Sequence, residues 1–221
     1  MEKYVNNMGK RKPSPVRTDD INLSTFFSDI LDKTFYPQET TNFQRINTFT
    51  EQIKGVDVIF DIGDKHYICD EKAAVTWRNL NTYSLEISFI NSMNKIQDGW
   101  LVSDNEINNA YVFIWIDDND LGSTTRVNYK HIKFDKITVA IIQKQKIIEY
   151  LESLGWTTEK LKQKAINIRN NPNKEYMGNI KKDGCKFSFT TKLVEQPINV
   201  ILPKSVYLQM ADKTWEYISD Y

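Results

Sequence analysis

The chain has 221 residues, 40% hydrophobic and 26% charged, which fits one globular domain able to bury a sizeable core. Lysine plus arginine and aspartate plus glutamate each number 29, so net charge alone gives no argument for a polyanionic partner. Two cysteines exclude a disulfide framework, and no apolar stretch approaches the roughly 18–20 residues that cross a bilayer. Because the first residues also lack the apolar core of a secretory signal, we expect a cytoplasmic protein with no membrane segment.

Residues 1–19 mix Lys, Arg, Pro and Asn without periodicity and predict a flexible basic N-terminal arm, followed by a single domain over 20–221. The domain opens with an amphipathic helix, because apolar residues recur there at helical spacing: Leu23, Phe26, Phe27, Ile30 and Leu31. Residues 35–55 are ambiguous, and we expect a loop followed by a short helix that ends at Gly55.

From residue 56 the apolar period changes to that of strands. Residues 56–62 and 66–74 are rich in β-branched and aromatic residues and are separated by Gly-Asp-Lys, which predicts a hairpin. Residues 82–90 alternate and predict a third strand. Residues 110–116 form a nearly unbroken apolar run, which indicates a strand covered on both faces. Further edge strands are expected over 127–134 and 136–142.

The last third of the chain is predicted to return to helices. Two helices are expected first, over 143–156 and then from the Lys-rich segment to about Asn170. Strands at 185–193 and 197–203 and a closing helix at 204–218 complete the sequence, and 157–221 is a candidate C-terminal lobe. The sum is a mixed α/β domain.

Three charged residues interrupt the predicted hairpin. Because side chains alternate along a strand, Asp70 and Lys72 should share one face, and the hairpin should bring Asp57 beside Asp70. Two close, partly desolvated carboxylates either raise one pKa or hold a cation between them. Few hard oxygen ligands suit Mg²⁺, and a neighbouring lysine can orient a water or neutralise phosphate charge. These parts suffice to hydrolyse a phosphodiester, with Asp57, Asp70 and Lys72 as catalytic candidates.

The same three residues have a purely structural interpretation. Lys72 can neutralise Asp57 and Asp70 at a sheet edge, where charged side chains also discourage aggregation. An Asp followed thirteen residues later by Asp-x-Lys is a loose pattern in a chain of 26% charge.

The segment "GVDVIF…YICDEKAA" resembles the core of the PD-(D/E)XK nuclease superfamily. Asp57 matches its first carboxylate, Asp70 its second and Lys72 its lysine, while Val56 stands where the family often has proline. The resemblance extends in order to motifs of a group of phage and bacterial nuclease-like proteins: "QIKGVDV" (52–58), "DEKAA" (70–74), "NLNTYSLEISF" (79–89), "GWL" (99–101), "YVFIWI" (111–116) and "EQPINVIL" (195–202).

The resemblance implies a restriction-endonuclease-like αβββαβ core, a mixed central sheet flanked by helices, and a deoxyribonuclease that uses Mg²⁺ or, as a substitute, Mn²⁺. It also implies secondary roles: the backbone carbonyl of Glu71 as a metal ligand, Glu51 as a second-metal ligand and Gln52 as a substrate contact. One departure is that residues 91–109 lack the pattern of the long helix that the family has between its third and fourth strands, so we expect either a short helix or an insertion in its place.

Two further groups of residues are candidates with alternatives left open. Glu86 lies mid-strand and is either a further metal ligand or a solvent-facing residue. Residues 158–186 carry eight bases against three acids, so Lys162, Lys164 and Arg169 are candidate contacts to DNA phosphates, or else they form a solvated helix face.

Other cofactors and partners are disfavoured. His66 and His131 have no partner at metal-ligand spacing, which argues against zinc, and no phosphate-binding glycine motif indicates a nucleotide cofactor. The sequence predicts DNA as the partner and leaves the oligomeric state open, a homodimer included. Two alternatives to an enzyme are a DNA-binding protein that keeps the fold without turnover and an interaction protein in which the hairpin charges form a metal-free ion pair.

Overall fold

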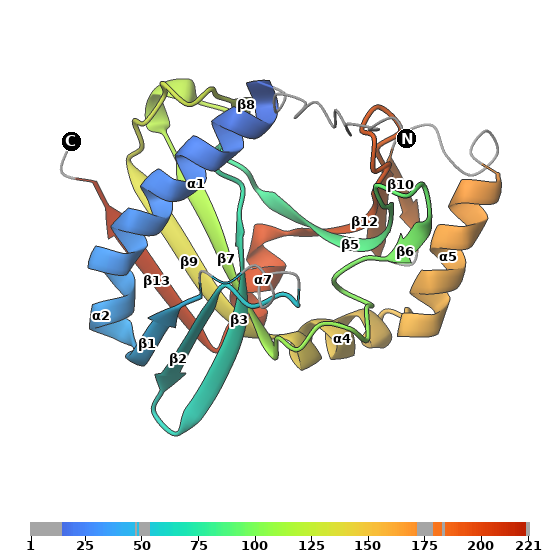
Figure 1. Ribbon diagram of the computed structural model, residues 1–221, viewed down its shortest axis with the longest axis horizontal. Helices are drawn as coiled ribbons and strands as arrows, with labels where there is room; N and C mark the ends of the chain where they lie inside the picture. Colours follow the sequence, from blue (N-terminus) through green and yellow to red (C-terminus); the bar gives the residue numbers. More distant parts are fainter. Residues whose placement is uncertain (1–14, 47, 49–53, 172–178, 183, 220–221) are drawn as a thin grey trace, which may run out of the picture.

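A six-stranded mixed sheet is the centre of the computed structural model, which describes residues 15–46, 48, 54–171, 179–182 and 184–219 (Figure 1). Its strands, in spatial order, are β1 (Thr41–Arg45), β2 (Val58–Ile62), β3 (Lys65–Ala73), β7 (Ala110–Asp117), β9 (Lys136–Gln143) and β13 (Lys213–Ile218). Strands β3 and β7 are parallel, and the other neighbouring pairs in this sheet are antiparallel.

A second, antiparallel sheet lies against one face of the first. Its strands, in spatial order, are β10 (Asn179–Lys182), β11 (Cys185–Phe189), β12 (Ile198–Pro203), β5 (Thr82–Ile90) and β6 (Ile96–Asp98). A small pair, β4 (Trp77–Arg78) and β8 (Thr125–Arg126), stands apart from both sheets.

Helices complete the layers on both sides of the first sheet. They are α1 (Pro15–Lys33), α2 (Phe35–Glu39), α4 (Lys144–Ser153), α5 (Thr158–Asn170) and α7 (Lys204–Met210), with a 3-10 turn η1 at Asn119–Leu121. Helices α1 and α2 pack on one face of the first sheet, and α4, α5, α7 and the second sheet share the core on the other face. No helix in the described part of the chain is long and apolar enough to span a membrane.

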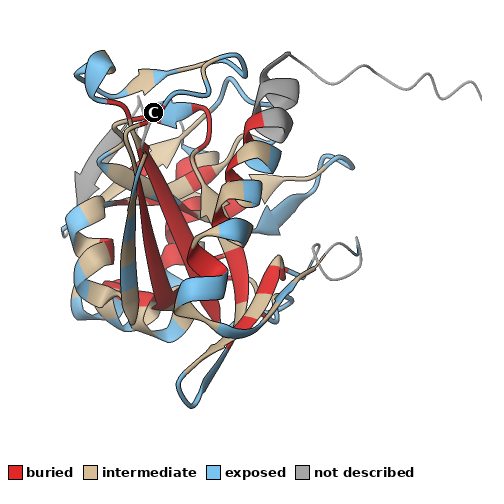
Figure 2. Ribbon diagram, turned by 90° about the vertical axis from the view of Figure 1, so that its left-hand side faces the viewer, coloured by how far each residue is buried: buried red, intermediate tan, exposed pale blue. Residues whose placement is uncertain are grey.

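Strand β7 is buried on both faces of the first sheet, and each face belongs to a different hydrophobic core. Its side chains Tyr111, Phe113 and Trp115 point into the core shared with the second sheet, whereas Val112 and Ile114 point toward α1. All of them are at most 2% exposed, and Figure 2 shows the central strands as buried. The prediction of a strand covered on both faces is therefore confirmed.

The predicted hairpin and most predicted helices are also confirmed. Strands β2 and β3 pair in register from Val58–Cys69 to Ile62–Lys65, with Gly63 at φ +57° in the turn between them. Helices α4 and α5 fall where helical periodicity predicted them. Helix α1 begins at Pro15, inside the segment predicted as a basic arm, and residues 1–14 lie outside the described residues.

The position of the third strand differs from the αβββαβ core that the resemblance implies. Strand β5 forms where the alternation predicted it, but it pairs with β12 and β6, and the edge of β3 is occupied by the parallel strand β7. Alternation identifies a strand without identifying its neighbour, since the same pattern suits any half-buried position. No helix forms over 91–109, in agreement with the sequence, so a simple αβββαβ order is not what the structure shows.

Four other segments differ from the predictions. Residues 41–45 are strand β1 rather than a loop, and 127–134 form no strand. Strand β9 lies inside the first sheet rather than at its edge. The predicted closing helix ends at Met210, and the rest is the edge strand β13, whose burial alternates with period two. The segment predicted as a C-terminal lobe thus contributes to both sheets, through β12 and β13.

A close contact at Gly99 joins the second sheet to the loop that follows it. A Cβ at this position would lie 2.4 Å from the carbonyl oxygen of Glu86, while the N–H of Leu101 donates to that oxygen at 3.1 Å. We expect Gly99→Ala to lower the free energy of unfolding by about 1–3 kcal/mol, because backbone rather than a mobile side chain must give way. Urea denaturation measures the change. Ser84→Ala, on the exposed side of β5, is the control, and equal stability of the two variants would contradict the contact.

Candidate active site

The hairpin brings together the three charged residues that the sequence singled out. Asp57 lies just before β2, where its N–H donates to the carbonyl oxygen of Cys69 at 2.8 Å. Asp70 and Lys72 project from the same face of β3, and Lys72 Nζ lies 2.5 Å from Asp70 Oδ2. The Asp57 and Asp70 carboxylates lie close enough to affect each other's pKa. The geometry predicted from strand alternation is therefore present.

Burial makes this carboxylate pair costly to ionise. Asp70 is 5% exposed, and burial raises its pKa against the opposing charge of Lys72. Burial, followed by the charge of Asp70, raises the pKa of Asp57 to about 6. Removing water from two neighbouring acids favours a shared proton or a bound cation, as the sequence led us to expect.

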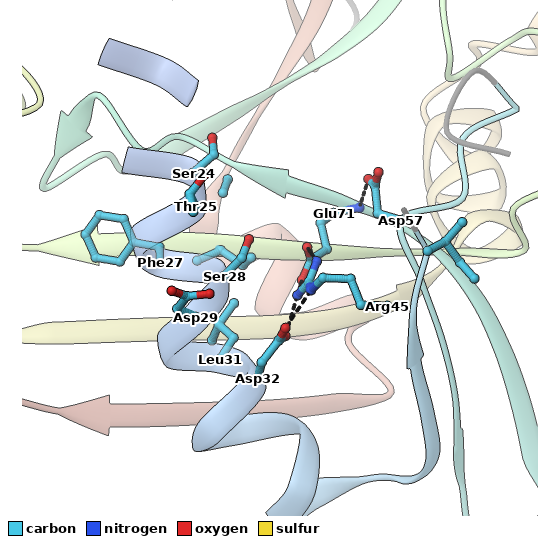
Figure 3. Close-up of a pocket in the computed structure, with 13 residues that line it drawn as sticks. Ser24, Thr25, Phe27, Ser28, Asp29, Leu31, Asp32, Arg45, Asp57 and Glu71 are labelled. Atoms are coloured by element: carbon cyan, nitrogen blue, oxygen red, sulfur yellow. Dashed lines mark hydrogen bonds and ion pairs between the residues drawn. The ribbon is translucent and has the colours of Figure 1, made fainter. Parts of the chain in front are cut away.

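Glu71 points to the opposite face of the strand, toward α1 (Figure 3). Its carboxylate accepts hydrogen bonds from Arg45 Nη1 at 2.6 Å and from the hydroxyl of Tyr36. Arg45 also binds both oxygens of Asp32, at 2.6 and 2.7 Å. The N–H of Glu71 donates to Asp57 Oδ2 at 2.9 Å, so the residue that anchors the strand also holds the first carboxylate in place.

A cavity of about 380 Å³ opens over Asp57, Asp70 and Lys72. Its other walls come from Gly55, just before β2, and from the second sheet and the loop after β6: Glu86, Phe89, Gln97, Asp98, Trp100, Ser103, Asn105 and Glu106. Glu86 reaches the cavity because the two sheets pack together, although β5 is not a neighbour of β3. Burial raises the pKa of Glu86 to about 7, opposed by Lys72.

Glu106 is a wall residue that sequence reasoning missed. Among the described residues, its Oε2 atom is buried and has no hydrogen-bond partner, and the same is true of Oδ1 of the neighbouring Asn108. Both atoms lie against Gly55, where a Cβ would be 2.0 Å from Glu106 Oε2. Burial raises the pKa of Glu106, and the charges of Lys72 and Lys144 oppose that rise. No spacing in the sequence signals this residue, because it comes from an irregular loop.

Trp100 contacts Lys72, the lysine of the trio formed by Asp57, Asp70 and Lys72. Lys72 Nζ lies 4.6 Å from the centroid of the Trp100 ring, a cation–π contact. The carbonyl oxygen of Trp100 accepts hydrogen bonds from the Tyr111 hydroxyl at 3.2 Å and from Lys144 Nζ at 3.3 Å. The "GWL" motif (99–101) therefore places an aromatic wall beside Lys72, and Gly99 permits its close approach to β5.

The bases predicted to contact DNA have partners within the protein. Lys162 Nζ pairs with Asp98 at 2.8 Å. Lys164 is 9% exposed and lies 6.0 Å from the Phe187 ring centroid. Arg169 donates to Ser88 Oγ and to the carbonyl oxygen of Gln196. In this structure Lys164 and Arg169 pack α5 onto the second sheet and do not present free cations, which leaves Lys162 as the more accessible candidate.

Glu51 and Gln52, predicted as a second-metal ligand and a substrate contact, lie outside the described residues.

The residues present suit a hard divalent cation, although they are not fully arranged for one. The described part of the chain contains no group of three or more His, Cys, Asp or Glu side chains already spaced to hold a metal. Asp57 and Asp70 nevertheless converge, and Glu106, whose Oε2 atom has no partner in the described part of the chain, lines the same cavity. All three supply carboxylate oxygens, the ligands that Mg²⁺ and Mn²⁺ prefer.

We compared the chain with protein-family models, curated proteins and solved structures, and none of the three comparisons found a match. The resemblance of the hairpin motif to a nuclease superfamily therefore stays a prediction.

If Glu106 helps to hold a cation, its charge should contribute to metal affinity. We expect Glu106→Gln to weaken Mn²⁺ binding in calorimetry by about tenfold, because one hard anionic ligand becomes a neutral amide. Asp104→Asn, in the same loop with a side chain 95% exposed, should leave affinity unchanged. Equal affinities for both variants and the parent would remove Glu106 from the ligand set.

Proposed function

We propose that this protein is a metal-dependent deoxyribonuclease that hydrolyses phosphodiester bonds of DNA. The observation that carries the proposal is the Asp57–Asp70 pair, buried at Asp70 and half-buried at Asp57, with Lys72 in contact on one face of the hairpin. Asp57 and Asp70 would hold Mg²⁺, or Mn²⁺ in its place, with the Glu71 carbonyl, Glu86 and Glu106 as further oxygen donors. The choice of DNA over RNA rests on the resemblance alone.

Each residue of the trio has a definable role in this chemistry. A bound Mg²⁺ would polarise a phosphoryl oxygen and favour deprotonation of a water. Lys72 Nζ, held by Asp70 and Trp100, can orient the attacking water and neutralise charge on the phosphate. The water oxygen forms a bond to phosphorus, and the bond from phosphorus to one sugar oxygen breaks. That sugar oxygen leaves with a proton, while the proton lost by water passes to a nearby base.

Part of the fold supports a restriction-endonuclease-like core. The acid-bearing hairpin β2–β3 continues into a parallel partner, β7, and α1 covers the face opposite the trio. Strand β5 in the second sheet and the absence of a helix over 91–109 are the departures. Neither departure alters the hairpin on which the proposed chemistry depends.

Two other functions use the same residues differently. A DNA-binding protein without turnover has no need to keep a repelling, partly buried carboxylate pair, so the pair favours an enzyme. An interaction protein would use the Lys72–Asp70 contact as a metal-free ion pair. Metal binding separates this last function from the others.

The purified protein should cleave DNA in Mg²⁺ or Mn²⁺ and lose that activity in EDTA, because the carboxylates need a cation to act on a phosphate. A panel of linear, nicked, forked and four-way DNA in each condition measures this. Cleavage that persists in EDTA would contradict the metal mechanism.

Asp70→Asn and Lys72→Ala should impair the protein in different ways. The first removes a metal-attracting charge, so Mn²⁺ affinity and cleavage should both fall. The second removes a cation from beside the site, so Mn²⁺ binding should persist or tighten while cleavage drops by about 10²–10⁴. Lys65→Ala, an exposed lysine on the same strand, is the matched control. If Lys72→Ala cleaves like this control, the amine is a structural counter-ion.

A further inference from the structure

Asp57 lies between two cavities. One is the cavity of about 380 Å³ that also contains Asp70, Lys72 and Glu86. The other, of about 510 Å³, lies on the opposite side of the hairpin, between α1 and the first sheet (Figure 3). Its lining includes Ser24, Ser28, Asp32, Arg45 and Glu71, and Asp57 closes it at the hairpin. Asp57 is therefore the residue that the two cavities share.

The depth of the site restricts what can reach it. Asp70 is 5% exposed. The wall of the cavity above it includes Glu86, which packs closely against Gly99, and Trp100, whose carbonyl oxygen accepts a hydrogen bond from Tyr111. Each cavity has the volume that single small ligands occupy, about 300–1,000 Å³. A phosphodiester must enter this space to meet Asp57 and Asp70. Enzymes that act inside such pockets take a single strand or extrude a nucleotide from the duplex at a cost in unstacking.

The charges of the cavities also disfavour a duplex. Among the described residues lining the smaller cavity, five are acidic (Asp57, Asp70, Glu86, Asp98 and Glu106) and Lys72 is the one base. On the α1 side, Arg45 is already paired with Asp32 and Glu71. A duplex brings twice the phosphate charge per unit length to these walls that a single strand does. The aromatic side chain of Phe89 offers an unpaired base an apolar contact that a duplex keeps covered.

We propose that the site takes single-stranded DNA, either free or as the unpaired branch or tail of a duplex. The scissile phosphodiester lies at Asp57 and Asp70, with the neighbouring nucleotides in the two cavities. This inference rests on the proposed nuclease function and names its substrate class.

Three oligonucleotide substrates of the same sequence test the proposal, each in Mg²⁺ and in Mn²⁺: a single strand, a blunt duplex and a duplex with a long single-stranded tail. The single strand and the tail should be cleaved, and the blunt duplex should be cleaved about a hundredfold more slowly, because its strand must first be unstacked. Equal cleavage of the blunt duplex and the single strand would overturn the inference and leave the nuclease function standing. No cleavage of any substrate would overturn both.

A variant that fills the cavity beside α1 tests the path of the strand. Ser28→Phe should lower single-strand cleavage at least about tenfold while leaving Mn²⁺ affinity unchanged, since Ser28 lines the cavity away from Asp70 and Lys72. Ser153→Phe, at the exposed end of α4, makes the same substitution outside both cavities and should cleave normally. Circular dichroism and Mn²⁺ calorimetry establish that the variant is folded. A folded Ser28→Phe variant that cleaves like Ser153→Phe would contradict the strand path.

Discussion

The ion pair between Arg45 and Glu71 is the interaction on which the candidate site depends. It ties β1 to β3 on the α1 side, and Asp32 and the Tyr36 hydroxyl complete its hydrogen bonds. The Arg45 and Glu71 side chains are both largely removed from water. Loss of Arg45 would therefore leave the charge of Glu71 without a cationic partner, whereas loss of Glu71 would leave Arg45 paired with Asp32. The N–H of Glu71 also donates to Asp57 Oδ2, so the residue that this ion pair anchors also positions the first carboxylate.

Because side chains alternate along β3, the residue that anchors the strand and the proposed catalytic residues lie on opposite faces. Glu71 faces α1 with its charge neutralised, whereas Asp70 and Lys72 face the second sheet, where Asp57, Glu86 and Glu106 add negative charge. Burial raises the pKa values of these acids, which means that the folded protein holds them at a cost. A cation shared among them offsets that cost and supplies a reason for the arrangement.

The sequence alone predicted the local geometry of the hairpin well and the long-range geometry poorly. Strand periodicity places Asp70 and Lys72 on one face and Glu71 on the other, because those positions depend only on the pleat. Glu86 was found as a candidate, yet it reaches the site through sheet-on-sheet packing rather than strand pairing. Glu106 had no sequence signal at all, since an irregular loop and Gly55 position it. Lys164 and Arg169 show the converse: a basic pattern along a helix does not reveal which cations pack inward.

A crystal of the protein soaked in Mn²⁺, measured at a wavelength where manganese scatters anomalously, tests the central claim most directly. The account predicts an anomalous peak between the carboxylates of Asp57 and Asp70, within about 2.0–2.3 Å of an oxygen of each. A map with no manganese there, and with Lys72 Nζ still bound to Asp70 Oδ2, would show that the trio is a metal-free ion-pair cluster and would contradict the claim.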